Sequence, residues 1–201
     1  FFLSNFRKEE FVEMNAAAMK YYIIASMTIF LGIALFRDVF ALIVGSNFRE
    51  GIFILPIVLG ANVLSGVWLN LSFWYKREEK TGYALWVTLS GLAASVVAGI
   101  ILIPRAGYYG AAWSRFIAEV VMVAVSLTLN RIHFPTPYDF GRIAEYVVVA
   151  MAIFFLTKFV TVDSIVLKYT INTIVLLLYL LYVVKREKID VAALIKAVLR
   201  R

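Results

Sequence analysis

The sequence contains no cysteine and a single histidine, which leaves no disulfide framework, no cysteine nucleophile and no conventional zinc site. Charged residues make up only 16% of the chain, too few for an intrinsically disordered segment. Four prolines and 11 glycines exclude a collagen-like or linker composition. No glycine-rich phosphate-binding loop followed by lysine is present. The sequence therefore predicts no catalytic residues, no ATP-driven motor, no cofactor and no metal centre.

Apolar residues dominate instead. They account for 63% of the 201 residues, and the mean hydropathy is +0.87, whereas soluble domains contain about 45–50% apolar residues. This composition predicts an integral membrane protein and disfavours a water-soluble enzyme. The chain begins at Phe1 and its first methionine is Met14, which we interpret as a piece of a longer protein.

Six apolar runs approach or reach the roughly 20 residues that a helix needs to cross a hydrocarbon core of about 30 Å. They are residues 21–36, 51–75, 82–103, 108–129, 144–160 and 165–184. We therefore predict an all-α membrane bundle of six transmembrane helices over residues 21–184, preceded by a cytoplasmic connecting segment over residues 1–20.

Two prolines and the tail add detail to this prediction. Pro56 predicts a kink in the second span, whereas Pro104 ends the third span because proline cannot continue the hydrogen-bond ladder of a helix. A tight turn over residues 104–107 follows. In the basic tail, residues 185–201, apolar residues recur at helical spacing and predict an amphipathic helix on the membrane surface. These are Val191, Leu194, Ile195, Val198 and Leu199.

The lysines and arginines that give the net charge of +7 are concentrated in every second loop between the spans. They do not form the single basic patch that is typical of nucleic-acid binding. Fourteen of them lie on the side of both termini and three lie on the other side of the six spans. Because cytoplasmic loops carry the excess of positive residues, both termini are predicted to be cytoplasmic. The predicted partner is the lipid bilayer, and no binding of nucleic acid is predicted.

Two ionisable residues fall inside the fourth span, where a charge is costly and is usually retained for function. Arg115 and Glu119 are one helical turn apart and share a face, about 10 Å and 16 Å from the non-cytoplasmic end. Two interpretations fit them. Either the two charges neutralise each other inside the bundle, or they line a polar cavity in which Arg115 meets an anionic group of the cargo, such as a phosphate.

Four other polar residues are weaker candidates. Asn62 and Asn70 in the second span either hydrogen-bond to a neighbouring helix or line a passage. Lys158 and Lys168 lie near the non-cytoplasmic ends of the last two spans, where snorkelling towards water explains them. Small residues at four-residue spacing predict close contact for the third and fourth spans. They are Gly91, Ser95 and Gly99, then Gly110, Ser114 and Ala118.

The turn between the third and fourth spans reads Leu-Ile-Pro-x-x-Gly-x-x-Gly-Ala-Ala at residues 102–112. It follows Ile54-Leu55-Pro56 and Lys80-Thr81-Gly82. In this order, the motifs resemble the C-terminal half of bacterial polysaccharide biosynthesis flippases, the O-antigen and capsule exporters of the multidrug/oligosaccharidyl-lipid/polysaccharide superfamily. The resemblance extends from about residue 21 to residue 131.

The resemblance implies a MATE-like bundle of two lobes around a central cavity, with this chain as the C-terminal lobe and the N-terminal lobe of the same chain as its partner. It also implies transport of an undecaprenyl-pyrophosphate-linked oligosaccharide from the cytoplasmic to the periplasmic leaflet of the bacterial inner membrane. Arg115 would be the residue that meets the lipid-linked oligosaccharide.

Three alternatives remain at this point. A cation-coupled multidrug antiporter of the same superfamily would use Glu119 for coupling. A membrane enzyme acting on lipid-linked sugars would need an acid/base pair or a nucleophile in a large external loop, and no loop in the sequence is long enough. A scaffold subunit would tolerate neutral substitutions at Arg115 and Glu119.

Overall fold

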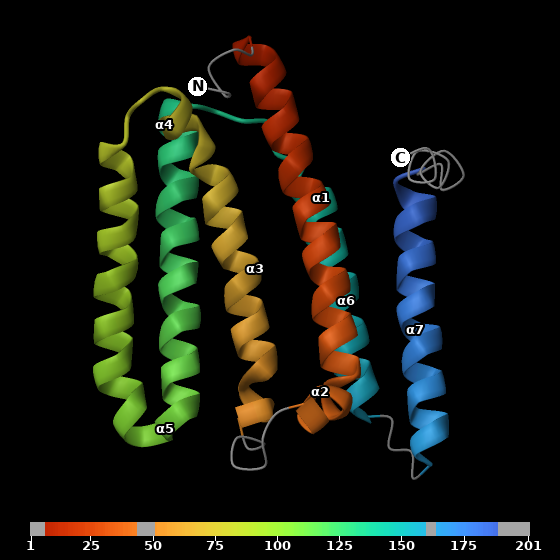
Figure 1. Ribbon diagram of the computed structural model, residues 1–201. Coiled ribbons are helices and arrows are strands. Elements are labelled where there is room, and N and C mark those ends of the chain that lie inside the picture. Colours follow the sequence, from red (N-terminus) through yellow and green to blue (C-terminus); the bar gives the residue numbers. More distant parts are fainter. Residues whose placement is uncertain (1–6, 44–50, 160–163, 189–201) are drawn as a thin grey trace.

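The computed structural model describes residues 7–43, 51–159 and 164–188, and the regular elements within these ranges are helices (Figure 1). Five of the helices are long and apolar enough to cross a membrane. The prediction of an all-helical, multi-pass membrane protein is confirmed at this level. The amphipathic helix predicted for the tail depends on residues from Val191 onward, which lie outside the described residues.

Helix α1 (Lys8–Leu35) starts earlier than the predicted first span, because most of the connecting segment before residue 21 is itself helical. Phe11 and Asn15 in that segment are already buried. Phe36 leaves helical geometry, and the chain continues into the short helix α2 (Arg37–Ile43). Helix α1 contacts α3, α6 and α7, so it is the central helix of this bundle.

The second predicted span forms helix α3 (Leu55–Leu71) and the short helix α4 (Phe73–Arg77). Pro56 lies in the first turn of α3, where its missing N–H would have had no partner within the helix. The kink predicted at this proline is therefore wrong. The helix is interrupted instead at Ser72, whose Oγ donates a hydrogen bond to the carbonyl oxygen of Leu69 at 2.5 Å.

Helix α5 (Gly82–His133) is a hairpin whose two limbs, residues 82–106 and 108–133, run antiparallel (Figure 1). Gly107 interrupts the helix with a φ of 53°, a conformation that residues with a Cβ rarely adopt. Pro104 lies in the last turn of the first limb. The limbs correspond to the third and fourth predicted spans, and the 102–112 motif is the reversal between them.

The second glycine of the motif brings the limbs together. A Cβ on Gly110 would lie 2.2 Å from the carbonyl oxygen of Leu102, so the two backbones could not approach this closely with any other residue. Along the same contact, a Cβ on Gly91 would lie 2.5 Å from Cγ of Met122, and Ser114 is buried. Of the small residues predicted to make close contact, Gly91, Gly99, Gly110 and Ser114 therefore line the interface between the limbs.

We expect Gly110→Leu to lower the melting temperature of the purified protein much more than Gly107→Ala. A leucine at residue 110 must displace the backbone of Leu102, whereas an alanine at residue 107 has open space and costs roughly 1–3 kcal/mol of backbone strain. Thermal unfolding in detergent measures the difference. Gly82→Ala, with nothing within 4 Å of the new Cβ, is the control. Equal melting temperatures for Gly110→Leu and this control would contradict the close contact.

Helices α6 (Phe140–Phe159) and α7 (Ile165–Arg186) occupy the fifth and sixth predicted spans. Together with α1 they enclose a core that includes Leu31, Tyr146 and Tyr179, each almost completely buried. Helix α7 touches α1 and α6 along a narrow seam, and three of its residues are buried. Because few of its residues are buried, polar contacts such as the hydrogen bond from Asn172 to the carbonyl oxygen of Leu35 add to its attachment.

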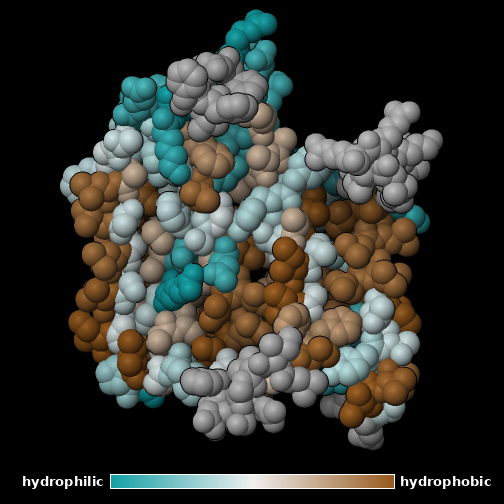
Figure 2. Space-filling view, in the orientation of Figure 1, coloured by the Kyte–Doolittle hydropathy of each residue, from teal (hydrophilic) through white to brown (hydrophobic). Residues whose placement is uncertain are grey.

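The outer surface is apolar along the helices and hydrophilic at one end (Figure 2). Large side chains such as Ile100, Phe159 and Val166 are more than two-thirds exposed, as expected for residues that face lipid. The end that holds the start of α1, helix α4 and the end of α7, uppermost in Figure 1, is called the basic end. Its basic residues include Lys8, Lys76, Arg77, Lys80, Arg131, Arg142, Lys185 and Arg186.

Candidate functional site

Arg115 and Glu119 lie on the second limb of α5 and bind residues of α3. Nη2 of Arg115 donates a hydrogen bond to Oδ1 of Asn62 at 2.8 Å. Oε2 of Glu119 accepts a hydrogen bond from Nε1 of Trp68 at 2.9 Å. Both residues lie in the described part of the chain, and no ion pair joins them. Each polar group therefore has its own hydrogen-bond partner on α3, and the Arg115 charge acts on the Glu119 carboxylate without a direct contact.

Close packing of α3 against the second limb of α5 sets up these contacts. Ala61 is completely buried, and a Cβ on Gly60 would touch the ring of Phe116 at 3.0 Å. Small residues thus let the two helices approach. Asn62 follows directly and is exposed, at the edge of the contact, where its amide reaches Arg115.

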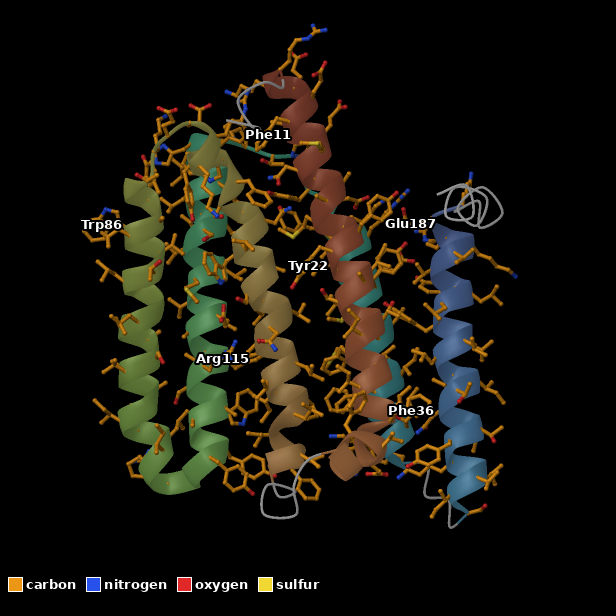
Figure 3. All side chains as sticks on the ribbon, in the orientation of Figure 1. Phe11, Tyr22, Phe36, Trp86, Arg115 and Glu187 are labelled. Carbon is orange, nitrogen blue, oxygen red and sulfur yellow. The ribbon has the colours of Figure 1, made fainter. Side chains whose placement is uncertain are left out.

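The two charged residues differ in exposure. Glu119 is 7% exposed, whereas Arg115 is exposed. Arg115 lies about midway along the bundle in Figure 3, and Figure 2 shows a hydrophilic patch at the same height, surrounded by pale and brown residues. Within the described residues, Arg115 forms no ion pair. A lone guanidinium at this depth is costly against lipid tails, so this surface, called the Arg115 face, requires water, protein or an anion against it.

A pocket of about 170 Å³ opens beside Asn62, between α1 and α3. The Tyr22 hydroxyl at this pocket lies 3.1 Å from the carbonyl oxygens of both Asn62 and Val63. The Tyr22 ring fits against α3 because Gly66 has no side chain, and a Cβ there would lie 2.0 Å from the ring. The pocket is lined by Tyr22, Ser26, Ile29, Phe30, Leu59, Asn62 and Val63. Sequence reasoning identified Asn62 but not its neighbours on α1.

Asn70, the other asparagine of the second span, belongs to a buried hydrogen-bond triad at the basic end. Its Nδ2 donates to the carbonyl oxygen of Asn15 at 3.3 Å, and its Oδ1 accepts from the Tyr138 hydroxyl at 3.2 Å. Nδ2 of Asn15 donates to the same hydroxyl at 3.0 Å. Burial raises the pKa of Tyr138 to about 12, which keeps this hydroxyl protonated. These contacts match the helix-packing interpretation of Asn70.

The two lysines at the opposite end have local partners. Lys168, in the first turn of α7, forms an ion pair with Asp38 of α2. The hydrogen bond and the charge of Lys168 lower the pKa of Asp38, against the opposing effect of burial. Lys158 lies over the ring of Phe154, 4.5 Å from its centroid. Lys168 therefore connects α7 to α2, whereas Lys158 contacts a ring of its own helix, α6.

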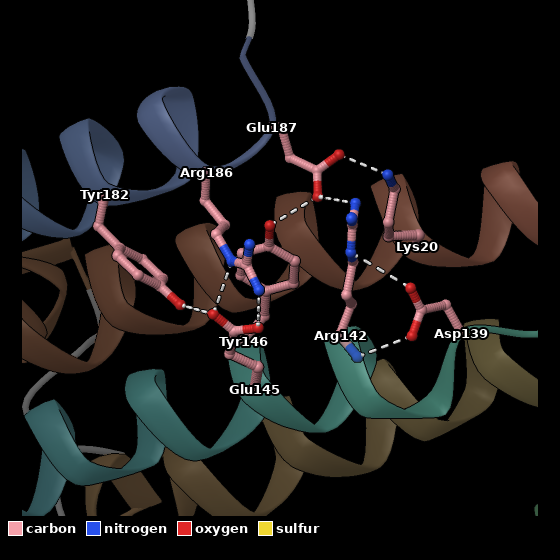
Figure 4. A network of polar contacts seen from close by, with 8 residues as sticks. All are labelled: Lys20, Asp139, Arg142, Glu145, Tyr146, Tyr182, Arg186 and Glu187. Atoms are coloured by element: carbon pink, nitrogen blue, oxygen red, sulfur yellow. Dashed lines mark hydrogen bonds and ion pairs between the residues drawn. The ribbon is translucent and has the colours of Figure 1, made fainter.

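A cluster of polar side chains that sequence reasoning missed joins α1, α6 and α7 near the basic end (Figure 4). The Glu187 side chain is 3% exposed and accepts hydrogen bonds from Nζ of Lys20 and, at 2.7 Å, from the Tyr146 hydroxyl. Beside it, Glu145 accepts two hydrogen bonds from Arg186, at 2.9 Å and 3.0 Å. This polar cluster consists of Lys20, Asp139, Arg142, Glu145, Tyr146, Tyr182, Arg186 and Glu187.

In the part of the chain that the structure describes, no group of three or more histidine, aspartate or glutamate residues is placed to hold a metal ion. A comparison of the chain with family models, with curated proteins and with solved structures gives no match. The assignment of a function therefore rests on the residues of this chain, above all on Arg115 and its surroundings.

Proposed function

We propose that the protein is a transporter of the flippase type. It moves undecaprenyl-pyrophosphate-linked oligosaccharide repeat units from the cytoplasmic to the periplasmic leaflet of a bacterial inner membrane. The observation that carries the proposal is the exposed Arg115 guanidinium, midway along an apolar bundle and outside any ion pair with the described residues. Its planar fork of donors matches the oxygens of a phosphate. The resemblance of residues 102–112 to the flippase turn supports the same class.

Six membrane crossings with both termini in the cytoplasm are part of the proposal. Each limb of α5 contains roughly 25 residues and reaches about 37 Å, enough to cross a core of about 30 Å. The hairpin then accounts for two crossings, and the basic end faces the cytoplasm. An N-terminal lobe of the same chain would lie opposite the Arg115 face, in a MATE-like arrangement, and would enclose a water-filled cavity between the lobes.

Asn62 orients Arg115 without neutralising it. A guanidinium has five N–H donors, and one of them donates to Asn62. The others can form charge-assisted hydrogen bonds with a pyrophosphate. Because the amide is neutral, this hydrogen bond does not offset the positive charge of Arg115, and the nearest acid, Glu119, has a hydrogen-bond donor of its own in Trp68. A contact of this kind draws an anionic headgroup into the bundle and can release it again when the cavity opens to the other side.

A second candidate, the cation-coupled multidrug antiporter, depends on Glu119. The Glu119 carboxylate is buried and accepts a hydrogen bond from Trp68, so a coupling cation would have to compete with the indole. Transport of a small cationic cargo that requires Glu119 but not Arg115 would favour this candidate. A scaffold protein would instead tolerate neutral substitutions at both residues.

The leaflet in which the lipid-linked oligosaccharide accumulates tests the proposal. We expect deletion of the gene in its host to leave the oligosaccharide on the cytoplasmic side, and a wild-type plasmid copy to restore its transfer. An Arg115→Ala copy should be expressed stably and fail to restore transfer. Arg105→Ala, which removes an exposed arginine before the hairpin turn, is the matched control and should restore it. Absence of accumulation in the deletion strain would remove the flippase assignment.

A further inference from the structure

The pocket between α1 and α3 and the Arg115 guanidinium share one residue. Asn62 lines the pocket, and its Oδ1 accepts the hydrogen bond from Arg115. Arg115 is not itself a lining residue, so a molecule whose anionic group lies on Arg115 would extend past the Asn62 side chain to reach the pocket. The pocket and the cation are therefore adjacent, and together they offer a charged part and an apolar part.

The apolar part is an open groove whose lining suits hydrocarbon. Four of its lining residues are apolar. Two of its polar groups are already engaged, because the Tyr22 hydroxyl lies against backbone carbonyl oxygens and Oδ1 of Asn62 accepts from Arg115. The volume of about 170 Å³ is many times the ~10–15 Å³ that one water molecule needs, so several carbon atoms fit. The apolar lining residues are Ile29, Phe30, Leu59 and Val63.

We infer that this pocket binds the first isoprenoid units of a prenyl-phosphate lipid while the phosphate lies on Arg115. The inference rests on the proposed function and adds which part of the cargo this half of the protein recognises. In a prenyl phosphate, hydrocarbon begins at the carbon that carries the phosphate oxygen. In a diacyl phospholipid, a glycerol and two polar esters come between the phosphate and the chains, so polar atoms would enter the apolar pocket.

Recognition at this junction has a consequence for specificity. The sugar of a prenyl-pyrophosphate-linked oligosaccharide is attached on the far side of the phosphates from the prenyl chain. The pocket and Arg115 therefore contact the part of the cargo that is the same in every repeat unit. Binding at this site should not depend on which sugar is attached.

Calorimetric binding of farnesyl phosphate to the purified full-length protein tests the inference. We expect binding to weaken about tenfold, ~1.4 kcal/mol, for Arg115→Gln, which removes the cation, and for Ile29→Trp, which fills the mouth of the pocket. Leu92→Trp, on the first limb of α5, is the matched control because Leu92 and Ile29 are almost equally exposed, at 58% and 59%. It should bind like the wild type. Leu59→Phe fills the pocket from the other helix if Ile29→Trp fails to fold.

Inorganic phosphate and phosphatidylglycerol distinguish the outcomes. Inorganic phosphate should bind weakly. Its affinity should fall further in Arg115→Gln and stay unchanged in Ile29→Trp. If both pocket variants bind farnesyl phosphate as tightly as the wild type while Arg115→Gln does not, the pocket inference is overturned and the proposed function stands. If Arg115→Gln binds normally, the phosphate contact of the proposed function fails too. If phosphatidylglycerol competes as well as farnesyl phosphate does, the assignment to prenyl lipids is overturned.

Discussion

Translocation of lipid-linked oligosaccharide is expected to slow about tenfold in Arg115→Lys and about 100-fold in Arg115→Gln, while the protein stays folded. Lysine keeps the positive charge but replaces a fixed fork of donors by a point charge, which costs the paired contact with phosphate. Glutamine removes the charge as well, and hydrogen bonds to charged groups contribute about 1.5–3 kcal/mol each. Because Arg115 is exposed and Glu119 accepts its hydrogen bond from Trp68, neither change removes the hydrogen-bond partner of the buried acid.

Vesicles reconstituted with the purified protein measure this rate for each variant. Arg105→Gln removes an equal charge from the same hairpin and should transport like the wild type. Asn62→Leu should slow transport less than Arg115→Gln, because it loosens the guanidinium without removing it. A fall in melting temperature that parallels the fall in rate across these variants would assign Arg115 a structural role instead.

The sequence predicted the helical spans well because hydropathy is a local property. The sequence also located the reversal at residues 102–112, because both glycines there meet local requirements. Gly107 adopts a backbone conformation that favours glycine, and Gly110 contacts the backbone of a segment only eight residues earlier. Pro56 was misjudged because the effect of a proline depends on where its helix begins. The apolar residues 51–54 looked like part of the span, yet α3 begins at Leu55.

The partners of the charged residues were harder to predict. Helical spacing placed Arg115 and Glu119 on one face, but their partners, Asn62 and Trp68, follow from how α3 packs along α5, and spacing within one helix does not determine that packing. The polar cluster was missed for the same reason. Glu187 and Lys20 are separated by 167 positions, and each looks like an ordinary charged residue near the end of an apolar run. The flippase assignment itself stays a prediction.

Glu187→Ala is expected to be the most destabilising single substitution in the polar cluster, by about 2–4 kcal/mol. The Glu187 carboxylate connects the end of α7 to Lys20 of α1 and Tyr146 of α6. Its removal leaves the Tyr146 hydroxyl without its acceptor on a fully buried residue, and it leaves Lys20 without its partner. Glu187→Gln should cost less, because the amide oxygen still accepts from Tyr146. The double variant Lys20→Met with Glu187→Leu should regain part of the loss, because it removes both charges together.

The pH dependence of unfolding provides an independent check on Glu187. Burial by itself raises the pKa of Glu187, but hydrogen bonds from Lys20 and Tyr146 outweigh burial and leave the pKa below its usual value. A lowered pKa in the folded state means that the stabilisation is complete above the pKa of the unfolded chain, about 4.3, and is lost as the pH falls through the folded value. The melting temperature of the wild type should therefore drop below about pH 4 more steeply than that of Glu187→Gln, which has no proton to take up at this position. Parallel pH curves for the two proteins would mean that the Glu187 carboxylate does not hold α7 against α1 and α6.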